Sequence, residues 1–184
     1  MEFYKRFIEI VDANLIYCLI PIILTLILVE LVFKNRFETK KALNLVRWTI
    51  IIYAIITGTI TILGIAIYLD DSTFVNRATG PYKIAYWTMF LSSLILPFTL
   101  LVKKLATKFW YVLFVAFCMK IGNYFERFVI ITTSLHRDYL PDNGNTEFAD
   151  SIMYIIGMIL MQGMLIAILT LGVFEMTKKK KNCA

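Results

Sequence analysis

The sequence is poor in the side chains that most enzymes use for chemistry. Its 184 residues include one histidine, His136, and three widely separated cysteines, Cys18, Cys118 and Cys183. The cysteines form no CxxC, zinc or iron–sulfur spacing, and a single histidine excludes a bis-histidine haem within the chain. A glycine-rich phosphate loop and a Ser/His/Asp nucleophile arrangement are also missing. We therefore expect no catalytic residue, no metal ligand and no cofactor bound by this chain alone.

Charge is scarce as well, because 17% of the residues are charged and 59% are hydrophobic. A soluble domain of this length could not bury so much apolar surface, so we predict an all-α integral membrane protein. Five apolar segments reach the length of about 20 residues that a bilayer crossing needs. They lie near 14–33, 48–69, 84–102, 109–132 and 152–174. The predicted organisation is an interfacial segment, 1–13, a single five-helix transmembrane domain, 14–175, and a basic tail, 176–184.

The net charge of +6 is distributed in a way that predicts membrane topology. Twelve lysines and arginines fall in the segments 34–47, 103–108 and 178–181, which alternate with the predicted spans. The segments on the other side carry fewer basic residues, diluted by aspartate and glutamate. Lysine and arginine collect on the cytoplasmic side, so we predict an N-terminus outside and a C-terminus inside. The expected partner of the basic excess is the lipid bilayer, not nucleic acid.

The predicted span 109–132 carries charges inside its apolar run. Glu126 and Arg127 are adjacent, and Lys120, Asn123 and Arg127 repeat at i, i+3 and i+7, so these three share one helical face. Charges inside a membrane helix are costly and usually face a protein interior or a water-filled cavity. Polar side chains at this depth therefore indicate a structural or functional use.

Two interpretations of Glu126 remain open. In the first, Glu126 is neutralised by Arg127 or Lys120, and the pair locks this helix to its neighbours. In the second, Glu126 is a protonatable carboxylate in a proton-conducting half-channel. That path would continue outward through the polar residues Thr132, Thr133, Ser134, His136 and Asp138.

Three smaller patterns also predict local structure. Glu30 and Lys34 are four residues apart at the end of the first span, which favours a helix-end ion pair over a proton carrier. Pro97 should kink or fray the third span near its inner end. The second span is dense in small and hydroxyl residues, which favour close helix–helix contact over a hydroxyl-lined path. These residues are Thr57, Gly58, Thr59, Thr61 and Gly64.

The outer segment 70–83 contains a turn signal, Gly80-Pro81, directly before the third span. Asn76 and Arg77 are expected to cap this turn or to contact an outer partner. The aromatic residues that follow fit a belt at the membrane–water boundary. They are Tyr82, Tyr86 and Trp87.

The segments 74–87 and 122–141 resemble the NrfD/polysulfide-reductase family of membrane subunits. The closest likeness is to the NrfD-like quinol-oxidising subunit of alternative complex III, which carries very similar NRA-x-GPY-xx-AYW and FERFVI-xx-TSLHRDYLP motifs. Family members are about twice as long and contain two four-helix bundles. The resemblance implies that this chain matches the second bundle plus the last helix, and that the first bundle, with much of the quinone pocket, has no counterpart here.

The resemblance also implies a function and a location. The chain would be a multi-pass subunit of a respiratory quinone-linked oxidoreductase complex in a bacterial inner membrane, with its N-terminus in the periplasm and its C-terminus in the cytoplasm. Its partners would be NrfD-like membrane subunits and iron–sulfur and cytochrome subunits, and these would hold the quinone, haem c and iron–sulfur clusters. The family's proton-path residues match Glu126, Arg127, Ser134, His136 and Asp138 in this sequence.

The resemblance leaves a second function open. A membrane carboxylate of the family aligns with Ile62, which cannot carry a proton, so the chain could instead be a reduced paralogue used for packing or assembly in another envelope complex. Under either function, the remaining motif residues are expected to have a structural role or to contact partner chains. They are Asn76, Arg77, Gly80, Pro81, Tyr82, Trp87 and Arg137.

Overall fold

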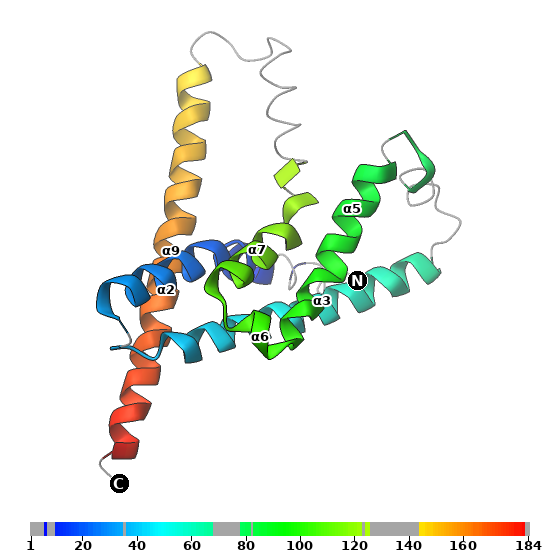
Figure 1. The fold of residues 1–184 in the computed structure, drawn as a ribbon. Coiled ribbons are helices and arrows are strands. Elements are labelled where there is room, and N and C mark those ends of the chain that lie inside the picture. The colour runs from blue at the N-terminus through cyan, green and yellow to red at the C-terminus, as the bar shows by residue number, and fades with distance from the viewer. Residues whose placement is uncertain are drawn as a thin grey trace. The chain divides into compact units, whose positions relative to one another are not determined.

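The computed structural model describes residue 6 and the ranges 10–34, 36–67, 78–81, 83–122, 124–125 and 144–182. Every secondary-structure element within these ranges is a helix (Figure 1). Four helices are long and apolar enough to cross a membrane: Asn14–Phe33, Thr39–Ile67, Lys83–Leu101 and Met153–Lys178. The all-α prediction is therefore confirmed, and the apolar helices are those of a multi-pass membrane protein.

Four of the five predicted spans coincide with these helices. The remaining one, predicted at 109–132, begins with an apolar helix, α7 (Phe109–Met119), which has 11 residues. The structure describes this span as far as Phe125 with the exception of Asn123, and its later residues lie outside the described ranges. By their internal contacts the residues form two compact units, Met1–Val46 with Arg127–Ala184, and Arg47–Glu126.

The first unit is built on the packing of α2 (Leu19–Phe33) against α9 (Gly144–Asn182) (Figure 1). A short π-helix, η1 (Asp12–Ile16), leads into α2, and its wider turn lets the backbone N–H of Tyr17 donate to the Asp12 carbonyl at 3.0 Å. The buried face of α2 is apolar and consists of Leu19, Pro21, Ile22, Ile23 and Leu26. Because α2 is apolar on nearly all sides, small residues on its partner decide how closely the two helices approach.

The second unit contains most of α3 (Thr39–Ile67), then α5 (Lys83–Leu94), η2 (Leu96–Leu101), α6 (Lys103–Ala106) and α7. The α-helical part of the third predicted span ends at Leu94, and a 3₁₀-helix with Pro97 in its first turn follows. Proline has no N–H for the i−4 carbonyl, so the expected disruption at Pro97 is confirmed. The Tyr111 hydroxyl donates to Thr99 Oγ1 at 2.8 Å and fastens this 3₁₀ turn to α7.

Large apolar side chains cover the outside of both units. Trp110 is 70% exposed, Ile84 77% and Leu31 70%. Such a surface would drive aggregation in water, but in a bilayer it faces lipid tails of the same polarity. The exposed apolar surface therefore agrees with the membrane assignment made from composition.

Candidate functional site

Most of the residues predicted to carry function lie outside the described ranges. This applies to the predicted proton path, Glu126, Arg127, Ser134, His136 and Asp138, and to Asn76, Arg77, Tyr82 and Arg137. The ion pair expected between Glu126 and Arg127 or Lys120 therefore stays a prediction. Gly80, Pro81, Trp87 and Lys120 lie within the described ranges. Three local arrangements of polar residues occur on or next to the described helices.

The first arrangement is a buried lysine in the second unit. Lys120 directly follows α7 and is 7% exposed. Its Nζ donates a hydrogen bond to the Tyr53 hydroxyl at 3.1 Å and lies 5.2 Å from the centre of the Tyr53 ring. The ammonium thus meets both an oxygen acceptor and an aromatic face, which together offset part of the cost of burying a charge.

The expectation that charges in this segment face the protein interior is confirmed for Lys120. Sequence reasoning placed Lys120 on a polar helical face with Asn123 but missed Tyr53 as its partner. Helical periodicity shows which residues share a face, and it does not show which residue of another helix meets that face. The only sign of this contact in the sequence was the presence of Tyr53 within the second predicted span, one helical turn before Thr57.

The threonine hydroxyls at positions 57, 59 and 61 of the second span do not form a further arrangement. Thr57, Thr59 and Thr61 each donate to the backbone carbonyl four residues earlier, at 2.8, 2.7 and 2.8 Å. A hydroxyl satisfied by its own helix needs no water and no partner. Gly58, by contrast, is buried, and a Cβ there would lie 2.6 Å from Leu94 Cδ1. The close-contact interpretation of this span is confirmed at Gly58.

The second arrangement is the turn that precedes α5. The indole N–H of Trp87 donates to the Ala78 carbonyl at 3.2 Å, across the Gly80-Pro81 turn. Trp87 and Tyr86 also contact the Phe90 ring, at centroid distances of 5.8 and 6.2 Å. Trp87 is 40% exposed. The aromatic group predicted here as a membrane belt therefore also closes the turn from which the third span begins.

The third arrangement is a group of charges at the lysine-rich end of the first unit. Glu38 lies 3.3 Å from Lys41 and 3.5 Å from Lys178, and Lys178 lies 3.9 Å from Glu175. The hydrogen bond from Lys41, with Lys178 nearby, lowers the pKa of Glu38 below its ordinary value. These contacts join the segment after α2 to the end of α9. The sequence assigned Lys178 to topology and to contact with the lipid bilayer, because a lysine run carries no information about its partners within the chain.

The predicted ion pair between Glu30 and Lys34 is wrong. Thr39 Oγ1 donates to Glu30 Oε2 at 2.5 Å, and Thr39 is 2% exposed. Lys34 ends α2 with a φ of 35°, in the left-handed region, so the chain leaves the helix at this residue. The Lys34 backbone N–H still donates to the Glu30 carbonyl at 3.0 Å, and the chain that turns away after Lys34 brings the start of α3 against the Glu30 carboxylate.

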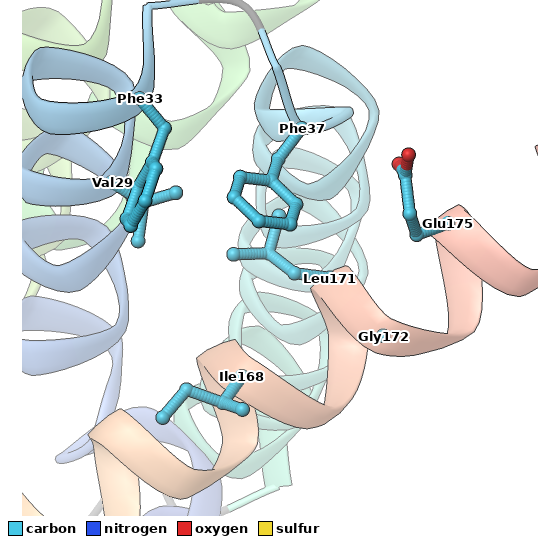
Figure 2. Close-up of a pocket in the computed structure, with 7 residues that line it drawn as sticks. All are labelled: Val29, Phe33, Phe37, Ile168, Leu171, Gly172 and Glu175. Carbon is cyan, nitrogen blue, oxygen red and sulfur yellow. The ribbon is translucent and has the colours of Figure 1, made fainter.

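A pocket of about 240 Å³ lies between the end of α2, the segment that follows it and α9. Figure 2 shows Phe33 and Phe37 on one side of it and α9 on the other, with Glu175 on the turn beyond Leu171. Glu175 Oε2 is buried and accepts no hydrogen bond from the described residues. The lining residues are Val29, Phe33, Phe37, Ile168, Leu171, Gly172 and Glu175.

No group of three or more His, Cys, Asp or Glu residues that could hold a metal ion occurs in the described part of the chain. No family model matches the sequence, and no curated protein matches it either.

Proposed function

We propose that this chain is a membrane subunit of a multisubunit, quinone-linked respiratory complex of the alternative complex III type, in a bacterial inner membrane. Its partners are NrfD-like membrane subunits together with iron–sulfur and cytochrome subunits. The quinone, haem c and iron–sulfur clusters belong to those partners. The support from the sequence is the pair of motif-like segments, 74–87 and 122–141, which occur in the order found in NrfD-like subunits.

The single structural observation that supports a role in proton movement is the buried contact of Lys120 with Tyr53. Lys120 lies six residues before Glu126 in the same predicted span, 109–132, and two residues before the second motif-like segment begins. Polar and ionisable groups inside a membrane helix bundle are costly and are retained mainly at ion pathways and proton relays. A buried lysine hydrogen-bonded to a phenol is a suitable polar neighbour for a protonatable Glu126.

A second function is favoured by a different observation. The hydroxyls of Thr57, Thr59 and Thr61 donate to the backbone of their own helix, and Ile62, at the position aligned with the family's membrane carboxylate, is 57% exposed. Hydroxyls that are satisfied by their own helix, beside an isoleucine, favour packing over proton transfer at residues 57–62. The alternative proposal is accordingly a reduced NrfD-like paralogue that packs or assembles another envelope complex without conducting protons.

Purification of the full-length chain in a mild detergent, with identification of every protein that accompanies it, separates the two proposals. Under the first proposal, subunits with haem c and iron–sulfur clusters copurify, together with a longer NrfD-like membrane protein. Envelope proteins without redox centres would contradict it and support the assembly role. A parallel purification from cells that lack the tag identifies proteins that bind the resin alone.

A further inference from the structure

Three exposed lysines of the second unit lie on one tight turn: Lys103, Lys104 and Lys108. The backbone N–H of Thr107 donates to the Lys103 carbonyl at 3.2 Å, and that of Lys108 donates to the Leu105 carbonyl at 3.1 Å, so the turn is closed by its own backbone. Like charges one turn apart destabilise each other. The turn therefore favours an anion that reduces this repulsion.

A fourth cation reaches this turn from another helix. Arg47, in α3, donates from Nη2 to the Leu101 carbonyl at 3.3 Å, two residues before Lys103. Its guanidinium also lies 5.4 Å from the centre of the Trp48 ring. These two contacts hold the guanidinium at the start of the lysine turn. The four residues that form this basic cluster are Arg47, Lys103, Lys104 and Lys108.

The described residues of the second unit offer the three lysines no carboxylate. They include no aspartate or glutamate, and none of these lysines forms an ion pair with another described residue. The first unit differs, because there Lys41 and Lys178 lie 3.3 and 3.5 Å from Glu38. Membrane topology requires lysines on the cytoplasmic side but does not require that they lack counter-charges. The basic cluster is therefore the better site for an anion from outside the chain.

The position of the basic cluster along the helices indicates what kind of anion it meets. Leu101 is the last residue of the candidate span Lys83–Leu101, and α7 begins at Phe109. Trp48 is 46% exposed and Trp110 is 70% exposed. Tryptophan is enriched where the hydrocarbon meets the headgroups, and lysines at helix ends extend to the same level. An anion at this level that also has an apolar part is an anionic phospholipid.

We propose that the basic cluster binds the headgroup of an anionic phospholipid. The guanidinium of Arg47 and the lysine ammonium groups contact the phosphate oxygens, and the acyl chains pack on the exposed surface of Trp48 and Trp110. A zwitterionic lipid carries the same phosphate, but its ammonium cancels the charge that the cluster attracts. The proposal therefore selects one class of lipid. It is independent of the respiratory function, since it depends only on residues 47–48 and 101–110.

Native mass spectrometry of the full-length chain provides the test. The protein in detergent is mixed with equal amounts of phosphatidylglycerol and phosphatidylcholine that have the same acyl chains. Both lipids carry a phosphate and they differ in net charge, so they are matched probes. Each basic residue near the membrane surface adds about a fivefold attraction to anionic lipid, so we expect a preference for phosphatidylglycerol of about tenfold or more. Equal retention of the two lipids by the wild-type chain would overturn the proposal.

Three variants locate the binding to the basic cluster. Replacement of Lys103, Lys104 and Lys108 together by glutamine should remove most of the preference, and replacement of the same three residues by arginine should keep it. The control removes the same number of charges from the first unit, by replacing Lys40, Lys41 and Lys178 with glutamine. This control should keep the preference. A preference that survives in the glutamine variant of the cluster, or that is lost in the control, would contradict the proposal.

An acidic segment of a partner protein is the other kind of anion that a basic cluster attracts, and the same variants distinguish it. In that case the wild-type chain would retain the two lipids equally. The glutamine variant of the cluster would then lose a copurifying protein that the wild-type chain and the control both keep. This pair of results would show that the basic cluster is a protein contact and that the phospholipid proposal is wrong.

Discussion

Thr39 and Glu30 are joined by a hydrogen bond across the turn between α2 and α3, with Thr39 Oγ1 donating to Glu30 Oε2 at 2.5 Å. Thr39 is 2% exposed, and Glu30 belongs to the last turn of a candidate span. This bond satisfies a carboxylate near the membrane end that would otherwise lack a donor from the described residues. It therefore positions the start of α3 relative to α2 within the first unit.

Replacement of Thr39 by valine should destabilise the protein. Valine has nearly the same shape but no hydroxyl, so Glu30 Oε2 loses its donor at a cost of about 1–3 kcal/mol. The free energy of unfolding, measured in mixed detergent micelles, checks this. Thr59→Val is the matched control, because Thr59 is exposed and bonds only to the Ile55 carbonyl of its own helix. Equal losses in the two variants would mean that the bond to Glu30 contributes nothing.

A methyl group at Gly163 should disrupt the packing of α2 on α9. A Cβ there would lie 2.6 Å from Pro21 Cγ and 3.1 Å from the Cys18 carbonyl oxygen, and neither a proline ring nor backbone can move aside easily. We expect Gly163→Ala to lower the thermal unfolding midpoint, with a cost of about 1–3 kcal/mol.

Gly157→Ala, on the same helix, has nothing within 4 Å of its Cβ and serves as the control. Alanine is favoured over glycine in a helix by about 1 kcal/mol, so this variant should be neutral or stabilised. A Gly163→Ala protein as stable as the control would show that α2 and α9 do not meet at Gly163.

Glu38 should make the stability of the first unit depend on pH. Its pKa is lowered in the folded protein by the hydrogen bond from Lys41 and by Lys178. A group with a lowered folded pKa binds fewer protons when folded, so its contribution is present above the unfolded pKa, about 4.3 for glutamate. The contribution is lost as pH falls through the lower folded pKa. Unfolding measured from pH 6 downward should show a steeper loss for the wild-type chain than for Glu38→Gln, and identical slopes would contradict this role.

Tyr53 and Lys120 should be energetically coupled. Tyr53→Phe removes the acceptor of a buried ammonium and should cost about 1–3 kcal/mol. Lys120→Met removes the charge but keeps most of the apolar volume. If the contact is direct, the double variant should cost clearly less than the sum of the single variants, as a double-mutant cycle of unfolding free energies would measure. Strict additivity would contradict the coupling.

Glu126→Gln tests the proton role within the proposed respiratory complex. The amide has the shape of the carboxylate but cannot exchange a proton near neutral pH, so quinol-dependent turnover of the purified complex should fall about tenfold or more if Glu126 conducts protons. Assembly of the complex, followed by copurification of its subunits, should stay unchanged. Full turnover with full assembly would remove the proton role and leave a structural one.

Hydropathy alone was sufficient to predict the class of protein and most of the spans. The segments 14–33, 48–69, 84–102 and 152–174 each coincide with a long apolar helix, because a run of about 20 apolar residues has few alternatives to a membrane helix. The break at Pro97 was predictable for the same kind of reason, since the missing N–H is a property of the residue itself.

The tertiary structure decided which residues of different helices contact one another. Glu30 meets Thr39 instead of Lys34, Lys120 meets Tyr53, and Gly163 meets Pro21. In an apolar bundle the surrounding lipid is as apolar as the helices, so the sequence gives only a weak signal for which face turns inward. The rotation of each helix about its axis and the identity of its neighbour follow from packing between segments far apart in the chain. Local sequence therefore determined where the helices lie along the chain, and only their packing determined which side chains meet.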